Sequence, residues 1–207
     1  MNENNEISLP NYILRSLFAA WKVIQINPKA MDYFDLSSDG FWKSFWAIAV
    51  MLPVFILNLI YRTQGMGQPL FATELIFFFI TLPLNAFVMY YFTRYMNINT
   101  NYPSMVIANN WVSAASFNIL VLSTLIINLL APQNIMSSVV LIIISFYFGI
   151  FAGWFMYRIS LQISGALAVG VLLFDILFSQ SVRIIVLKIL DPEIYQGMLD
   201  TIHNLPS

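Results

Sequence analysis

The chain has 207 residues, of which 59% are hydrophobic and only 9% are charged. Soluble domains carry about 45–50% apolar and about 25% charged residues, and a soluble globule of this size could not hide so much apolar surface from water. The nine Lys and Arg residues form no basic stripe, so composition excludes a nucleic-acid binder as well as a soluble enzyme. We therefore predict an all-α, polytopic membrane helix bundle.

The residue types that carry most catalysis and metal binding are nearly absent. There is no Cys, and the single His, His203, lies in a polar tail. The sequence therefore lacks the residues needed for disulfides, thiolate metal sites and paired-His zinc motifs. The sequence also contains no Gly-rich phosphate-binding motif. We expect no enzymatic activity, no cofactor and no metal site.

Residues 1–40 are predicted to form a cytoplasmic N-terminal segment with an amphipathic helix at about 9–26. At 100° per residue, four apolar side chains share one arc and two basic side chains point nearly opposite: Ile13, Leu17, Trp21 and Ile24, against Arg15 and Lys22. Such a helix suits the cytoplasmic membrane interface, which we favour. The alternative is a helix packed against the spans.

Five apolar stretches follow, each long enough to cross a bilayer of ~30 Å, which takes about 20 helical residues. Polar or Gly- and Pro-containing breaks separate them. We place the spans at about 41–61, 70–92, 105–130, 136–157 and 166–190, within a transmembrane domain at 41–190. Residues 191–207 then form a short polar C-terminal tail.

The distribution of basic residues predicts the orientation. One side of the proposed membrane carries six Lys and Arg residues, and the other side carries two: Arg15, Lys22, Lys29, Lys43, Arg94 and Arg158, against Arg62 and Lys188. The positive-inside bias places the N-terminus in the cytoplasm, and an odd number of spans places the C-terminus outside.

Three charged residues lie well inside the proposed spans: Glu74, Asp175 and Arg183. A charge at mid-membrane costs ~2.5–3.5 kcal/mol on insertion scales and normally finds a partner within the bundle. Asp175, Ser179 and Arg183 recur every four residues, giving one polar stripe on the fifth span. Their depths predict two polar layers joining the second and fifth spans, Glu74 with Arg183 and Asp175 with Asn85.

These polar residues and two prolines leave two interpretations open. The polar layers are expected to cross-link helices structurally, and a proton or ion relay is the alternative. Pro53 and Pro83 lie near the middle of the first and second spans. Proline removes a backbone donor and kinks a helix, and broken helices line binding sites in transporters. Kinked packing is the favoured interpretation.

Small residues repeat every four positions on the last two spans. The two sets are Ser145, Gly149 and Gly153 on the fourth span, and Ala166 and Gly170 on the fifth. Such faces let helix backbones approach closely. Contact within the bundle is the favoured interpretation, because a short loop joins the two spans, and homodimerisation is the alternative.

One motif precedes the first span: Asp35-Leu36-Ser37-Ser38-Asp39-Gly40-Phe41-Trp42. It resembles the Asp-Leu-x-Gly-Pro-Phe-Trp entry motif of the Yip1 family, with one extra residue and no proline between Gly40 and Phe41. The resemblance implies a cytoplasmic N-terminus, five spans and a role in scaffolding or partner binding. The same pattern resembles membrane proteins of alphaproteobacteria, which implies a bacterial inner membrane.

The expected function is accordingly that of a non-enzymatic scaffold, or an accessory or assembly subunit, acting through helix packing and the cytoplasmic N-terminal region. The expected surroundings are the lipid bilayer together with a membrane-protein partner or further copies of the chain. The alternative is a small transporter or channel that uses Asp175, Arg183 and the helices interrupted at Pro53 and Pro83.

Overall fold

The computed structural model describes residues 8–65, 72–131 and 135–203, and no strand occurs among them. The α-helices are α1 (Leu9–Ile24), α2 (Ser38–Lys43), α3 (Ala47–Ile60), α4 (Ala72–Tyr95), α5 (Tyr102–Leu130), α6 (Ile135–Phe146), α7 (Ala152–Leu161), α8 (Gly165–Leu190) and α9 (Pro192–His203). Short 3₁₀ segments are η1 (Ala30–Tyr33), η2 (Ser44–Trp46) and η4 (Asn99–Asn101), and π-helical segments are η3 (Tyr61–Gly65) and η5 (Tyr147–Phe151).

Five helices in the described chain are long and apolar enough to cross a membrane, which confirms the predicted number and the all-α class. They cover Ser38–Gln64, Ala72–Tyr95, Asn99–Leu130, Ile135–Leu161 and Gly165–Leu190. The first combines α2, η2, α3 and η3, and the fourth combines α6, η5 and α7. The third begins six residues before the expected boundary, because η4 leads directly into α5, whose first turn tolerates Pro103. The expected start of the second span, at residue 70, lies outside the described residues.

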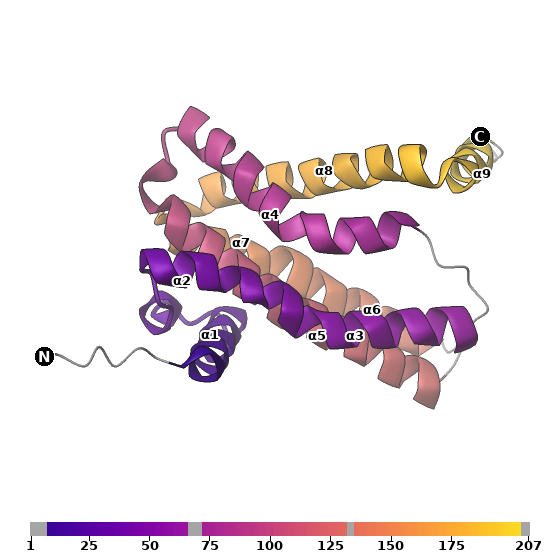
Figure 1. The fold of residues 1–207 in the computed structure, drawn as a ribbon, viewed down its shortest axis with the longest axis horizontal. Helices are drawn as coiled ribbons and strands as arrows, with labels where there is room; N and C mark the ends of the chain where they lie inside the picture. Colours follow the sequence, from indigo (N-terminus) through magenta and orange to yellow (C-terminus); the bar gives the residue numbers. More distant parts are fainter. Residues whose placement is uncertain (1–7, 66–71, 132–134, 204–207) are drawn as a thin grey trace, which may run out of the picture.

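The spans form two groups (Figure 1). In one group α3 packs against α5, and α5 packs against α7; in the other, α4 packs against α8. The pairing of α7 with α8 joins the groups. We call the end of the bundle that carries α1 and α2 the cap end; α9 lies at the opposite end (Figure 1).

Helix α1 packs against the spans. It is seen nearly end-on in Figure 1 while the spans run across the view, so it crosses them, and it contacts α5 and α7. Its buried face consists of Tyr12, Ser16, Ala19, Ala20, Val23 and Ile24. The apolar arc that the sequence favoured as a membrane-facing surface is therefore divided: Ile24 is buried, whereas Trp21 is 45% exposed.

The preferred interfacial placement of this helix is thus not confirmed, and the packed alternative describes its position. The physical reason is size. Ser16, Ala19 and Ala20 are small enough for the backbones of α1 and α5 to approach, and a helical wheel of large apolar residues gives such positions no weight. Leu14, Phe18 and Trp21 form an exposed apolar strip on the remaining surface of α1.

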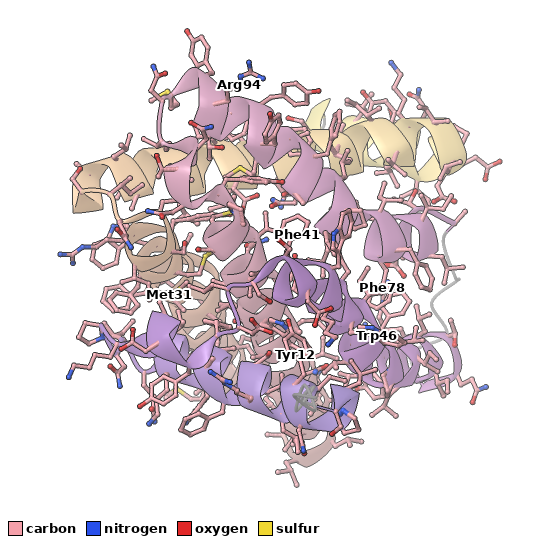
Figure 2. The ribbon with its side chains drawn as sticks, turned by 60° about the vertical axis from the view of Figure 1, so that its left-hand side comes forward. Tyr12, Met31, Phe41, Trp46, Phe78 and Arg94 are labelled. Atoms are coloured by element: carbon pink, nitrogen blue, oxygen red, sulfur yellow. The ribbon has the colours of Figure 1, made fainter. Side chains whose placement is uncertain are left out.

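A hydrogen-bonded core holds α1, α2 and α5 together at the cap end. The Tyr12 hydroxyl donates to the carbonyl of Gly40 at 2.8 Å, and the Trp111 indole N–H donates to the Tyr12 hydroxyl at 3.3 Å. Their rings meet edge-on, with centroids 5.7 Å apart. Nearby, Asn110 donates to the Ser44 hydroxyl at 2.8 Å. Figure 2 shows Tyr12 between α1 and the helix start that carries Phe41.

The motif that resembles the Yip1 entry sequence forms the turn into α2. The Ser37 backbone N–H donates to the Asp35 carboxylate at 3.1 Å, and the Ser37 hydroxyl accepts from the Gly40 N–H as a helix N-cap. Gly40 is buried, and a Cβ there would lie 2.1 Å from the Asp35 carbonyl oxygen. Leu36 and Trp42 are exposed. The glycine is therefore required by close packing of the turn.

Candidate intramembrane cavity

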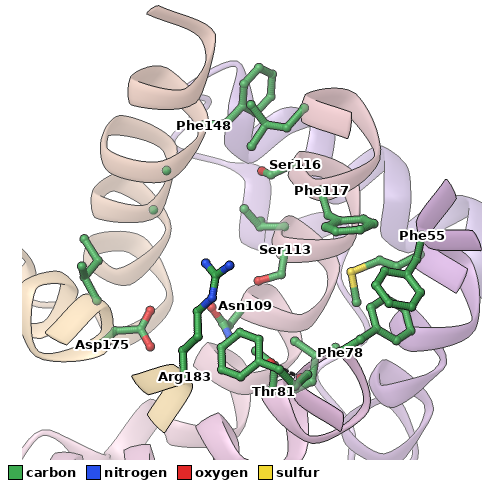
Figure 3. A pocket seen from close by; sticks show the side chains of 18 of the residues that line it. Phe55, Phe78, Thr81, Asn109, Ser113, Ser116, Phe117, Phe148, Asp175 and Arg183 are labelled. Atoms are coloured by element: carbon green, nitrogen blue, oxygen red, sulfur yellow. Dashed lines mark hydrogen bonds between the residues drawn. The ribbon is translucent and has the colours of Figure 1, made fainter. Parts of the chain in front are cut away.

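A cavity of about 700 Å³ lies between the α4–α8 pair and the group formed by α3, α5 and α7. All five spans contribute to its wall, which is largely apolar but contains uncharged polar side chains from four helices: Asn58, Thr81, Asn109, Ser113, Ser116 and Tyr157. Figure 3 shows several of these side chains around the central space. The cavity therefore brings polar side chains from separate helices to one largely apolar space.

Four charged side chains also line the cavity, and two of them pair. Arg62 of η3 forms a salt bridge with Glu74 near the start of α4. The predicted layer of Glu74 with Arg183 is therefore wrong. Arg62 and Glu74 flank the same short connection between the first and second spans, so proximity along the chain favours this pair over a cation on the fifth span.

The second predicted layer, Asp175 with Asn85, is confirmed. The Asn85 side-chain amide of α4 donates to the Asp175 carboxylate of α8. Asn109 of α5 extends the chain by donating to the Asn85 side-chain oxygen at 3.3 Å. The network thus ties together the second, third and fifth spans. Sequence reasoning missed Asn109, although its polarity inside an apolar run marked it as unusual.

Tyr157 of α7 adds a fourth helix to the surroundings of Asp175. Its side chain is 1% exposed, and its hydroxyl lies within interaction range of the Asp175 carboxylate. The hydroxyl makes no hydrogen bond of ordinary geometry with a described residue. Ser116 on α5 likewise lines the cavity with a buried hydroxyl that has no described partner. Buried polar groups are normally satisfied, so both hydroxyls leave hydrogen-bonding capacity in the cavity wall.

Arg183 is the charged lining residue with no hydrogen bond or ion pair to a described residue. It is exposed on α8, and its guanidinium reaches into the cavity between Asp175 and Ser113 in the view of Figure 3. Ser179, on the same predicted stripe, is half-buried but does not line the cavity. Of the three residues of the stripe, Asp175 and Arg183 therefore line the cavity and Ser179 does not.

The two prolines lie away from the cavity. Pro53 and Pro83 are exposed, and α3 and α4 continue through them as helices. Helix α4 bends near its middle (Figure 1), which is where Pro83 lies in its sequence, and proline causes such a bend. Neither proline lines the cavity, and the bend in α4 is the effect on helix shape that the structure shows.

Both glycines of the fourth span line the cavity, and only one of them makes a close contact with another helix. A Cβ added at Gly153 would lie 3.2 Å from Leu172 of α8, which is a close helix contact. At Gly149 an added Cβ would meet nothing within 4 Å, and both glycines line the cavity. Ser145, Ala166 and Gly170 are exposed. The favoured interpretation of contacts within the bundle is therefore wrong for Gly149 and Gly170 and holds at Gly153.

Fold and cavity together define a class, namely a multi-pass membrane protein with five helices long and apolar enough to cross a bilayer. Comparison with known proteins finds no matching family model, no matching curated protein and no matching solved structure. The resemblance of residues 35–42 to the Yip1 entry motif therefore remains a prediction.

Proposed function

We propose that the bundle binds a small molecule inside the membrane, as a binding protein or small transporter without enzymatic activity. The observation that carries this proposal is the cavity, whose wall combines polar side chains from the first four spans with Asp175 and Arg183 of the fifth. Its volume of about 700 Å³ lies within the ~300–1,000 Å³ of typical ligand pockets. The mixed wall, largely apolar with a few convergent polar groups, is also typical of such pockets.

Arg183 supports the proposal energetically. A charge costs ~2.5–3.5 kcal/mol at the centre of a span, and charged residues within spans usually pair or face a water-filled space; Arg183 lies in the last third of α8. Because Arg183 has no described partner and reaches into the cavity, water or a ligand must solvate it. The proposal therefore places water in the cavity when no ligand is bound.

We further propose a cell inner membrane location, with the N-terminus in the cytoplasm and the C-terminus outside. The count of basic residues supports this orientation, because Arg15 on α1, Arg94 at the end of α4 and Arg158 on α7 all belong to the side with more positive charge. In this orientation the cap end faces the cytoplasm.

Cysteine accessibility tests the proposed cavity, since the natural chain contains no Cys. Ser113→Cys and Ser116→Cys place thiols in the cavity wall, and Ser145→Cys places one on the exposed surface of α6. A membrane-impermeant thiol reagent needs the thiolate, which forms in water. We expect at least about tenfold faster reaction at 113 or 116 than at 145. Equal and negligible reaction at all three positions would contradict a water-filled cavity.

Filling the cavity gives a second test with a matched control. Gly149→Leu projects a side chain into the cavity space, whereas Gly170→Leu projects one from the exposed surface of α8. We expect Gly149→Leu to slow the labelling of Ser113→Cys and Gly170→Leu to leave it unchanged. The reverse pattern would show that the cavity is not the reagent's route.

A second candidate function is that of a scaffold or accessory subunit with a membrane-protein partner or a second copy. The exposed small residues Ala166 and Gly170 favour it, because a Cβ at Gly170 would meet nothing within 4 Å and another helix could approach closely there. Blue-native electrophoresis of the wild type and Gly170→Leu tests this function. A complex that dissociates in the variant would favour it, and identical migration as a single chain would contradict it.

A further inference from the structure

We propose that the cavity ligand is an amphipathic anion whose acidic group binds at Arg183 and whose apolar chain lies against the aromatic wall of α3, α4 and α5. This inference rests on the proposed function and specifies its ligand. The three observations that carry it are the supply of hydrogen-bond donors, the state of the two cavity carboxylates, and the position of the aromatic rings.

The cavity wall offers donors that lack acceptors. Arg183 carries five N–H donors and accepts none, and it has no described partner. The Ser116 hydroxyl is buried, makes no hydrogen bond to a described residue and lines the same cavity, whereas the Tyr157 hydroxyl lies beside the Asp175 carboxylate. A guanidinium together with a hydroxyl donor matches the oxygens of a carboxylate or a phosphate monoester, because charge-assisted hydrogen bonds to such groups are the strong ones.

The cavity carboxylates are already engaged. Glu74 accepts from Arg62, and Asp175 accepts from Asn85. A cationic ligand would have to compete with these donors and would still leave Arg183 without a counter-charge. Like charges repel, so Arg183 disfavours a cation at its own side of the cavity and Asp175 disfavours an anion at the other, which places the acidic group of the ligand at Arg183 and away from Asp175. No group of three or more His, Cys, Asp or Glu residues in the described chain could hold a metal ion either.

The apolar part of the ligand has a defined wall. Phe55 of α3 stacks on Phe78 of α4 with ring centroids 4.0 Å apart, and Phe117 of α5 lies 6.1 Å from Phe78. In Figure 3 these rings face the cavity from the side opposite Asp175, with the Arg183 guanidinium between the two sides. A molecule with an acidic head at Arg183 can therefore lay its chain on the aromatic side, as a single-chain acidic amphiphile would.

Photo-crosslinking tests the ligand class in the full chain reconstituted in nanodiscs of zwitterionic lipid. Three probes share one diazirine-bearing alkyl chain and differ only at the head: a carboxylic acid, a phosphate monoester and a primary alcohol. Peptide mass spectrometry locates the adducts. We expect both acidic probes to label the cavity residues around Phe78, each about tenfold more than the alcohol. If one acidic probe labels the cavity more than the other, its head group shows whether the natural ligand carries a carboxylate or a phosphate.

Variants assign the effect to Arg183. Arg183→Gln should reduce cavity labelling by the acids about tenfold to the level of the alcohol, and Arg183→Lys should retain most of it. The control Lys188→Gln removes a cation from the same helix, α8. Lys188 does not line the cavity, so this variant should leave the cavity labelling unchanged. The behaviour of Arg183→Lys and Lys188→Gln separates loss of binding from loss of folding.

The contradicting outcomes are distinct. Equal cavity labelling by acids and alcohol, unchanged in Arg183→Gln, would overturn the anionic ligand while leaving a ligand-binding cavity in place. Adducts confined to the lipid-facing surface, such as the exposed side chains of α6, with every probe, would overturn the cavity function itself.

Discussion

The two ends of the bundle use polar residues in opposite ways. At the cap end Asn110 is 1% exposed and bonds to Ser44, and Trp111 is fully buried against Tyr12. Towards the other end, the buried positions of α8 stop at Leu172, and Arg183 beyond them reaches into open cavity space. One end fills its interior with closely packed side chains, and the other leaves open volume beside Arg183. Tight packing therefore lies at the cap end, and open volume lies beyond it.

The largest expected loss of stability comes from removing a large buried side chain at the cap end. Trp111→Ala removes a fully buried side chain and its hydrogen bond to Tyr12, so we expect a loss of about 3–5 kcal/mol in the free energy of unfolding. Thermal unfolding in detergent measures it. Trp42→Ala is the control, because Trp42 is 72% exposed and should cost little. Equal effects of the two variants would contradict a packed cap end.

Adding one methyl group at Gly40 or at Gly170 compares the packed cap end with the exposed surface of α8. Gly40→Ala pushes a Cβ to 2.1 Å from the Asp35 carbonyl oxygen, so the turn must shift, at an expected cost of about 1–3 kcal/mol. Gly170→Ala meets nothing within 4 Å, and alanine in a helix interior should stabilise by about 0.5–1 kcal/mol. Opposite shifts in melting temperature are expected. A neutral Gly40→Ala would show that the turn is not tightly packed.

The polar network beside the cavity should matter less for stability. Asn85→Ala removes the donor to Asp175 and the acceptor for Asn109, and we expect a loss of about 1–2 kcal/mol. The control Thr81→Val removes a hydrogen bond within the α4 backbone turn only and should cost less than about 0.5 kcal/mol. Unfolding in mixed micelles measures the free energy of unfolding of both variants. An Asn85→Ala variant as stable as wild type would show that the network does not stabilise the bundle.

The smallest expected effect is a pH dependence at the cap end. Burial raises the pKa of Tyr12 above its ordinary 10.0. The unfolded chain therefore loses this proton first, and the stability that Tyr12 contributes is present below about pH 10 and falls as the pH rises through the folded-state pKa. Melting temperatures compared at neutral and strongly alkaline pH should show a smaller decline in Tyr12→Phe than in wild type. Parallel declines would contradict a buried, neutral Tyr12.

Sequence reasoning predicted what depends on composition and helical period. The number of spans followed from apolar length, and the pairing of Asn85 with Asp175 followed from comparable depths on antiparallel helices. The same depth argument failed for Glu74 and Arg183, because it ignored Arg62, which a short connection brings closer. Depth alone does not choose among cations within reach.

Two features could not be predicted from the sequence. The contacts of Tyr12 with Gly40 and Trp111 join positions 28 and 99 residues apart, and no local pattern specifies such meetings. The cavity depends on volume left unfilled between the spans. Gly149 is one sign of it, but a glycine that keeps space open has the same sequence pattern as a glycine that packs against a helix.

The most direct test of the central claim, that the bundle encloses a small acidic ligand, is native mass spectrometry of the protein extracted gently from its own membrane. We predict a single-chain species carrying a small acidic adduct, retained in Lys188→Gln and lost in Arg183→Gln. A bare chain without adduct, accompanied by a stoichiometric foreign subunit, would contradict the ligand-binding account and support an accessory subunit instead.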